Sequence, residues 1–199
     1  MKLKNLLEII LLITLFITSA NAMKQDEIQP IMTKKIDNVL EILEHKSLPM
    51  AQKGPHIIKI IDEAFDYELM AKIALGKETW DTLNEQKQKE FTKTFETKFK
   101  NSYIEKLELY NDQKVKIIGL NPYKNGRLQL ETELLGKEGT YKINYNFYNK
   151  AKDGEQWLIY DVDLVGVSII QTYRQQFAGL LKEKSFDEML ALLQNPNTK

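Results

Sequence analysis

The chain of 199 residues contains no cysteine and only two histidines. Without cysteine the protein can form no disulfide, hold no metal through thiolates and use no thiol as a nucleophile or lipid attachment point. His45 and His56 stand at no spacing that pairs either of them with a second metal ligand. A folded domain of this composition therefore depends on its apolar core.

Excess charge of either sign is also missing, because 28 basic residues balance 28 acidic ones. Domains that bind nucleic acid carry a clustered basic excess. Adsorption to an anionic membrane requires polybasic segments. The interspersed charges argue against both classes of partner and predict a solvated surface.

Motifs for catalysis are scarce. Gly166-Val167-Ser168 lacks the second glycine of a nucleophile elbow, because Ile170 stands in its place. No glycine-rich phosphate-binding loop occurs. Asp161 and Asp163 share one strand face, as paired catalytic carboxylates can, but we expect this polar face to look at solvent. The residues therefore predict a protein that is not an enzyme and uses no cofactor or metal.

The first 22 residues have the pattern of a secretory signal peptide. Lys2 and Lys4 form a basic start, Ile9 to Ile17 form an apolar run, and Ala20-Asn21-Ala22 is a small-x-small cleavage site. The alternative is an uncleaved anchor, but the run is short for a membrane span of about 20 residues. We expect a leader at residues 1–22 and a single mature domain at residues 23–199.

The first half of the mature chain has helical spacing. We expect a helix over residues 25–46, a second opened by Gly54-Pro55, and a third that Asp66 caps and Gly76 ends. A capping box at residues 82–85 predicts the start of a long helix. That helix carries an aromatic stripe: Phe91, Phe95, Phe99 and Tyr103.

After residue 113 the period of the apolar residues changes to two, which predicts half-exposed antiparallel strands. The turns fall at Asn125-Gly126, residues 136–139 and Asp153-Gly154. Ser168 then caps a helix, and a capping box at residues 185–188 begins the last one. The fold class is therefore α+β, with an antiparallel sheet of four to five strands covered on one face by helices.

Two blocks of the sequence also resemble a known family. Residues 65–76, FDYELMAKIALG, are followed at the family's spacing by Trp80, and residues 160–177 read YDVDLVGVSIIQTYRQQF. These blocks resemble the MlaC (toluene-tolerance) family, the periplasmic phospholipid-binding components of the Mla ABC transport system. The likeness covers about residues 25–195, although Val165 stands where the family usually has glutamate.

The resemblance implies a lipid carrier with a pocket between sheet and helices. Its partners would be a phospholipid with two acyl chains, an inner-membrane MCE protein of an ABC transporter and an outer-membrane lipoprotein–porin complex. We expect a periplasmic monomer that maintains the lipid asymmetry of the outer membrane.

Strand alternation assigns the pocket floor to inward-facing residues: Val115, Ile117, Leu128, Leu130, Leu134, Tyr141, Ile143, Tyr145, Phe147, Val162 and Leu164. Helical spacing assigns its lid to a second set: Met70, Ile73, Phe91, Phe95, Tyr103, Ile170, Tyr173 and Phe177. Lys72 and Arg174 are candidates for the pocket mouth.

Two other classes of function stay open at this point. An adaptor or chaperone would have the same apolar pattern with a filled core, because a cavity and a core both need inward apolar residues. An enzyme on this architecture would need a buried acid or base, for which Tyr141 and Tyr145 are the best candidates.

Overall fold

The computed structural model describes residues 23–152 and 154–195. The predicted leader at residues 1–22 and Asp153 of one predicted turn lie outside the described residues. The first half of the described chain is helical: α2 (Gln25–Glu44), α3 (Met50–Ile61), the short 3-10 turn η1 (Asp62–Ala64), α4 (Tyr67–Leu75), α5 (Lys77–Thr82) and α6 (Glu85–Leu107). No helix among these residues is long and apolar enough to cross a membrane.

The second half is a sheet followed by two helices. The strands are β1 (Lys114–Tyr123), β2 (Arg127–Gly136), β3 (Gly139–Asn149), β4 (Trp157–Leu164) and the short β5 (Val167–Ser168), and the closing helices are α7 (Ile169–Leu180) and α8 (Phe186–Gln194). The strands pair in sequence order, each antiparallel to the next. The predicted α+β class and antiparallel meander are confirmed.

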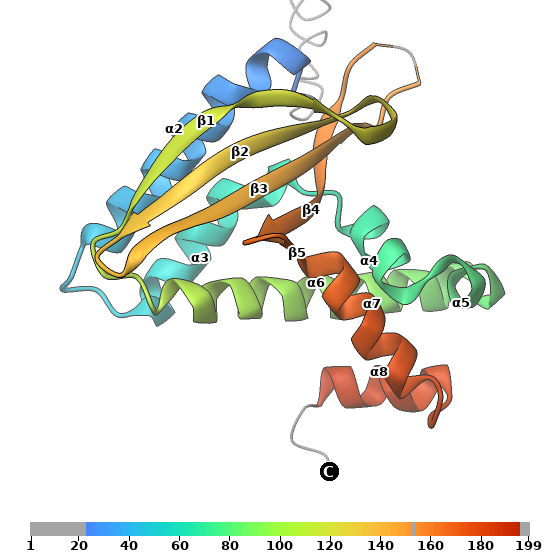
Figure 1. Cartoon of the computed structure of the whole chain (residues 1–199). Helices are drawn as coiled ribbons and strands as arrows, with labels where there is room; N and C mark the ends of the chain where they lie inside the picture. Colours follow the sequence, from blue (N-terminus) through green and yellow to red (C-terminus); the bar gives the residue numbers. More distant parts are fainter. Residues whose placement is uncertain (1–22, 153, 196–199) are drawn as a thin grey trace, which may run out of the picture.

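Helices α2, α3 and α6 lie on one side of the sheet, while α4, α5, α7 and α8 extend the structure beyond its edge (Figure 1). Helix α6 belongs to both parts. Phe91, Phe95 and Phe99, toward its start and middle, are buried among the outlying helices. Tyr103 and Leu107 in its second half pack against α2 and α3.

The sequence placed two helix starts wrongly. Asn84, not Thr82, caps α6, because its side chain accepts a hydrogen bond of 2.9 Å from the Lys87 amide. Thr82 instead ends α5, where its hydroxyl donates to the Thr79 carbonyl.

The pair Gly54-Pro55 lies inside α3, which begins after Pro49. A Cβ atom at Gly54 would stand 3.5 Å from Ile104 of α6, an ordinary van der Waals distance, so α3 lies directly against α6 at this residue. Helix α2 likewise continues through Pro30. Packing therefore overrides these two breaker signals.

Three apolar cores hold the elements together. The helical core joins α4 to α8, with these buried members: Met70, Ala71, Ala74, Leu75, Trp80, Phe91, Phe95, Phe99, Ile170, Tyr173, Phe177, Met189 and Leu190. The sheet core joins α2 and the segment before α4 to the sheet: Met23, Ile28, Met32, Ala64, Leu128, Leu130, Phe147, Trp157, Ile159 and Val162. The α2–α3 core contains Val39, Leu43, Ile57 and Ile61.

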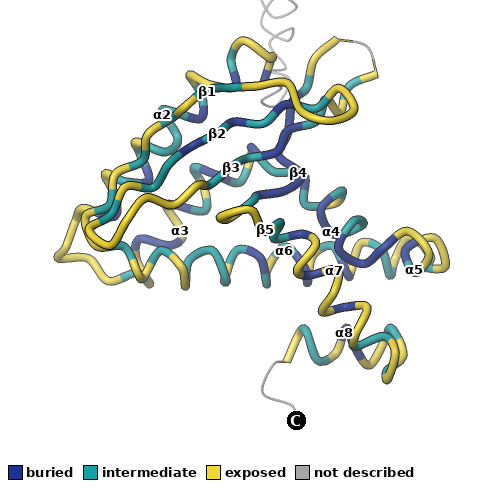
Figure 2. Tube along the Cα trace, viewed as in Figure 1, coloured by how far each residue is buried: buried dark blue, intermediate teal, exposed yellow. Residues whose placement is uncertain are grey.

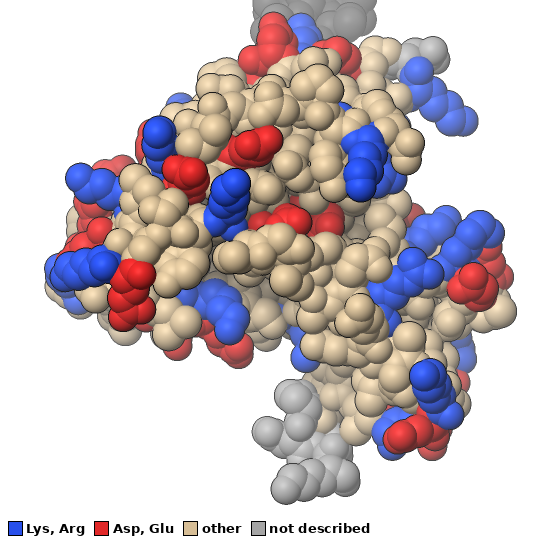
Figure 3. Space-filling model, in the orientation of Figure 1, with Lys and Arg blue, Asp and Glu red and all other residues tan. Residues whose placement is uncertain are grey.

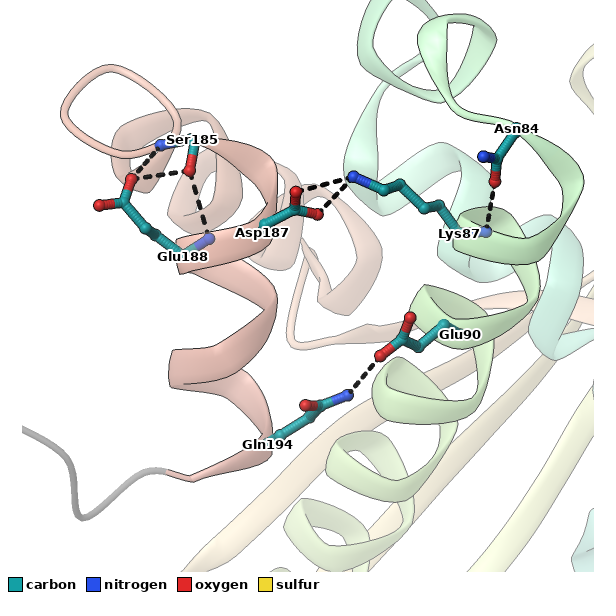
Figure 4. A network of polar contacts seen from close by, with 7 residues as sticks. All are labelled: Asn84, Lys87, Glu90, Ser185, Asp187, Glu188 and Gln194. Atoms are coloured by element: carbon teal, nitrogen blue, oxygen red, sulfur yellow. Dashed lines mark hydrogen bonds and ion pairs between the residues drawn. The ribbon is translucent and has the colours of Figure 1, made fainter.

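Helix α8 closes the helical core from outside. Met189 and Leu190 are buried in that core, and polar contacts join the helix to α6 (Figure 4). Lys87 donates to both carboxylate oxygens of Asp187 at 2.6 and 2.8 Å, and Gln194 donates to Glu90 at 3.2 Å. The predicted capping box at Ser185 and Glu188 is present.

Candidate functional site

The inner face of the sheet consists of four rows of side chains that run across the strands. Antiparallel register places directly paired residues on the same face, so each row can be followed from β1 to β3, and three of the four continue into β4. The rows are Val115–Leu134–Tyr141, Ile117–Thr132–Ile143–Leu164, Leu120–Leu130–Tyr145–Val162 and Pro122–Leu128–Phe147–Ile159. Apart from Thr132 and Pro122, every member is a large apolar or aromatic residue.

Burial changes steeply from the first row to the fourth. In β3 the exposed fraction falls from 42% at Tyr141 to 0% at Phe147, with Ile143 and Tyr145 half-buried between them. Strands β2 and β3 accordingly change from exposed near their shared hairpin to buried at the opposite end (Figure 2). The sheet core is therefore sealed at one end and open toward the hairpin at residues 136–139.

Two tyrosines lie deep in the molecule and still keep accessible surface. Burial raises the pKa of Tyr145 to about 12. Burial, and secondly the nearby Tyr145, also raises the pKa of Tyr103. Both side chains are nevertheless only half-buried. The two rings are therefore largely surrounded by protein without being fully sealed from solvent.

Phe65 marks where the three cores meet. This half-buried ring packs against the helical core, the sheet core and the α2–α3 core. It also contacts Tyr67 and Phe99, with centroids 5.8 and 5.5 Å away. Phe65 therefore joins the three cores without being fully buried itself.

Asp66 anchors the segment that carries Phe65. Asp66 caps α4 through the Leu69 amide at 3.0 Å and accepts from Tyr148 and from Lys150, the latter at 2.9 Å. Its backbone amide donates to the Ile159 carbonyl at 2.9 Å. Burial alone would raise the pKa of Asp66, but the bonds from Tyr148, Leu69 and Lys150 together hold it below its usual value.

The structure divides the predicted pocket residues into separate groups. The predicted floor lies on the inner face as the alternation indicated: Val115, Ile117, Leu128, Leu130, Leu134, Tyr141, Ile143, Tyr145, Phe147, Val162 and Leu164. Of the predicted lid, only Tyr103 packs against the α2–α3 core. The other lid residues belong to the helical core or pack against it: Met70, Ile73, Phe91, Phe95, Ile170, Tyr173 and Phe177.

The two predicted mouth residues lie on the helical part of the molecule. Arg174 lines a surface hollow of about 270 Å³ between α5 and α7, beside Gly76. Lys72 is half-buried on α4. Neither stands in the rows of the inner face.

The predicted floor omitted four members of these rows, one of which is the polar Thr132. The other three, Leu120, Pro122 and Ile159, were missed because each strand that carries them contains an irregularity. The register of β1 and β2 shifts between Ile117 and Gly119, and that of β3 and β4 shifts beside Tyr160. Each extra residue exchanges the two faces of the strand. Tyr160 consequently lies under Arg127, whose guanidinium carbon is 4.3 Å from the centroid of the Tyr160 ring.

The expectation that Asp161 faces solvent is wrong. Its side chain is 8% exposed, and it accepts hydrogen bonds from the Ser168 hydroxyl at 2.7 Å and the Ile170 amide at 3.1 Å. Burial raises the pKa of Asp161 above its usual value. Ser168 caps α7 as predicted, through the Gln171 amide. Asp161 thus helps to dock α7 on the sheet.

The described residues offer little for catalysis. They contain no group of three acidic, histidine or cysteine side chains that could hold a metal ion. Charges of both signs are interspersed over the surface seen in Figure 3, with large uncharged areas between them. The face seen there shows no single-sign cluster of charge that would attract a polyanion.

Comparisons with known proteins agree with this geometry. The family model described as MlaC protein matches residues 33–195. The Haemophilus influenzae intermembrane phospholipid transport system binding protein MlaC is 21% identical over 188 residues, which cover 92% of this chain and 87% of the relative.

A solved structure of a phospholipid-binding protein from Ralstonia solanacearum, in complex with a phospholipid, has the same fold. It superposes with a TM-score of 0.69 at 18% identity and covers 85% of this chain and 96% of its own. The resemblance seen in the sequence is confirmed, and the chain belongs to the MlaC family.

Proposed function

We propose that this protein is a periplasmic carrier that binds a diacyl phospholipid between the sheet and helices α2, α3 and α6. The observation that carries the proposal is the open half of the inner face. There Ile117, Ile143 and Tyr145, which alternation directs inward, are only half-buried. The H. influenzae relative is named for phospholipid transport, and the R. solanacearum structure holds a phospholipid, which supports the same ligand class here.

The proposed pocket uses fewer residues than the sequence pattern alone would include. Its floor is the half-buried part of the rows, chiefly Ile117, Ile143 and Tyr145, and its opposite wall is Tyr103 with Phe65. The outlying lid residues support this wall by filling the helical core. Lys72 and Arg174 remain candidates only for contact with a partner.

A carrier of this kind must hand over its lipid while docked. Each buried methylene gains about 0.8 kcal/mol, so two chains of about fifteen methylenes cost roughly 24 kcal/mol to expose to water. Release into free solution is therefore negligible. The partners implied by the family are an inner-membrane MCE protein of an ABC transporter and an outer-membrane lipoprotein–porin complex, with the carrier acting as a monomer between them.

The rim of the open end suits such docking. Leu164, Val165 and Val167 are 37%, 63% and 59% exposed around the tight turn between β4 and β5. Val165 adopts a φ of 53°, a conformation that costs energy for a β-branched residue. Residues 1–22 would serve as the leader that exports the single domain at residues 23–199.

Native mass spectrometry of the mature protein, purified from periplasm without detergent, tests the proposal. We expect a mass excess that denaturation releases as phospholipid, and Ile143→Glu should remove it by placing a charge in the pocket. Asn144→Glu is the matched control, because Asn144 is the next residue on β3 and lies on the outer face. A bare polypeptide mass for the wild type would instead support an adaptor with a filled core.

A further inference from the structure

Arginine is rare in this chain, and Arg174 has no polar partner within the described residues. Of the 28 basic residues only Arg127 and Arg174 are arginines. Arg127 lies over the ring of Tyr160. No hydrogen bond, ion pair or ring contact among the described residues uses the side chain of Arg174. A planar guanidinium can hold a carboxylate through two parallel hydrogen bonds, which the ammonium group of lysine cannot do.

Arg174 lies at a surface hollow of about 270 Å³ that has two walls. One wall is a face of α7 and its C-terminal end, because Arg174, Ala178 and Leu181 follow one another at helical spacing. The other wall is the corner at which α4 passes into α5 at Gly76. The hollow therefore belongs to the helical part of the molecule and shares no lining residue with the rows of the inner face.

Two small residues, Gly76 and Ala178, leave room in this hollow. Gly76 has a φ of 90°, which glycine adopts without strain. A Cβ atom there would stand 3.8 Å from Nε and 4.0 Å from Nη2 of Arg174, so the guanidinium lies beside the corner. Leu75 and Leu181 add apolar surface to the lining. The hollow thus combines apolar walls with a guanidinium that has donors to offer.

The charges at the hollow match a single negative group. Arg174 and Lys182 are its cations, and Glu78 is the one acidic residue among the described residues that line it. The side chain of Lys182 likewise has no polar partner in the described part of the chain. An excess of one positive charge favours one carboxylate over an anionic membrane or a nucleic acid, because both of these present many negative charges at once.

We infer that the hollow between α5 and α7 is a docking site for a partner protein that presents an aspartate or glutamate side chain next to an apolar one. Arg174 binds the carboxylate, and the apolar neighbour packs against Ala178 and Leu181. A partner held here does not occupy the inner face of the sheet. This docking goes beyond the proposed lipid binding and does not depend on it.

A titration with defined peptides tests the site. The isotope-labelled mature protein is titrated with an acetylated and amidated pentapeptide of sequence Ala-Leu-Glu-Leu-Ala, and NMR follows the backbone amide shifts. We expect saturable shifts at Gly76, Thr79 and Ala178 with a dissociation constant on the order of 1 mM. The same peptide with glutamine in place of glutamate should bind at least about tenfold more weakly, because it offers no charged acceptor.

Variants of the hollow separate charge, geometry and space. Arg174→Gln should weaken binding of the glutamate peptide at least about tenfold. Arg174→Lys keeps the charge and should restore only part of the affinity, since an ammonium group does not form the paired bonds. Ala178→Leu fills the hollow without changing any charge and should also weaken binding.

Lys59→Gln is the matched control, because it removes an exposed positive charge from α3, which does not line the hollow. It should leave the affinity for the glutamate peptide unchanged. Circular dichroism establishes that each variant is folded.

Glycerol phosphate, a soluble stand-in for a phospholipid headgroup, is titrated in parallel. Tighter binding of glycerol phosphate than of the glutamate peptide would overturn the carboxylate site in favour of a lipid headgroup. Equal binding of the two peptides, or undiminished binding by Arg174→Gln, would also overturn it. So would the absence of saturable shifts at the hollow up to about 20 mM peptide. None of these results bears on lipid carriage, which the native mass spectrometry measures separately.

Discussion

The helical core and the inner face of the sheet are built from the same residue types and are packed very differently. In the helical core, Phe91, Phe95 and Phe177 are at most 1% exposed and contact one another in edge-to-face and stacked pairs. On the inner face, Ile143 and Tyr145 keep accessible surface. The difference shows that an apolar sequence pattern determines which side chains point inward. The arrangement of the backbone decides whether those side chains fill the space between the layers.

Curvature of the sheet explains why its inner face stays open. Register shifts in β1 and β4 bend these strands and increase their twist. β4 pairs with only part of β3, ending at Leu164 opposite Ile143. The beginning of β3, including Tyr141, therefore has no neighbouring strand on that side among the described residues. Helix packing in the other half has no such constraint, and aromatic rings on α6 and α7 interlock.

The largest expected effect comes from placing a charge in the sealed part and, separately, in the open part of the inner face. Leu130→Glu should unfold the domain or destabilise it by about 3 kcal/mol or more. Leu130 is 0% exposed, so the introduced carboxylate would be buried without a partner. Ile143→Glu should leave the fold intact, because the half-open site admits water. Urea unfolding followed by circular dichroism measures both. Equal destabilisation would show that the sheet core is sealed throughout.

Shortening an apolar side chain to alanine should have a smaller effect, which again differs between the filled core and the open end of the inner face. Phe95→Ala should cost about 3–5 kcal/mol because it leaves a cavity in a filled core. Ile117→Ala, at the open end, should cost about 1 kcal/mol in the lipid-free protein, since its side chain already borders accessible space. The measurement is again the free energy of unfolding in urea. Similar costs per removed carbon at both sites would contradict the contrast.

Acid should weaken the attachment of α4 to the sheet through Asp66. The lowered pKa of Asp66 means that its stabilisation is present above the unfolded value of 3.8 and is lost as the pH falls through the folded value. Asp66→Asn should flatten the decline in stability below pH 3.8, as thermal unfolding over a pH series would show.

Asp161→Asn is the control with the opposite sign. The raised pKa of Asp161 makes the folded state gain stability as the pH falls toward 3.8, and the substitution should remove that gain. If the stability of Asp66→Asn declined with falling pH as steeply as that of the wild type, the bonds of Asp66 to Tyr148 and Lys150 would make no net contribution to stability.

The polar contacts of α8 should have the smallest effect. Lys87 and Asp187 are both substantially exposed, so a double-mutant cycle with alanine should give a coupling of about 0.2–1 kcal/mol that decreases with salt. The buried Met189 should matter more than this ion pair for holding α8 on α6. A coupling well above 1 kcal/mol would show that the exposed contacts of Figure 4 hold the helix.

Much of the fold could be read from local chemistry. Helix caps at Asp66, Ser168 and Ser185 and the alternation in β2 and β3 predicted their elements correctly, because caps and alternation depend on a few neighbouring residues. The start of α6 was misplaced by two residues, since Thr82 and Asn84 can both cap and only the position of α5 decides between them.

The candidate site was harder to predict than the fold. Alternation found the floor but assigned Phe95 and Phe177 to the same pocket as Ile143, although they belong to a different core. Phe65 was part of the family block without being recognised as the residue where the cores meet. A half-buried ring has no sequence signature, because its exposure depends on three distant segments.

By itself, the sequence determined which side of each regular strand faces inward, where most helices begin, that no thiol chemistry is available and which family the chain resembles. These properties follow from side-chain chemistry and local periodicity. Only the tertiary structure decided which apolar residues fill a core and which border open space. It also turned Asp161 inward. The reason is physical: the gap between two layers depends on bulges, helix approach and edge pairing, which join residues that lie far apart in the chain.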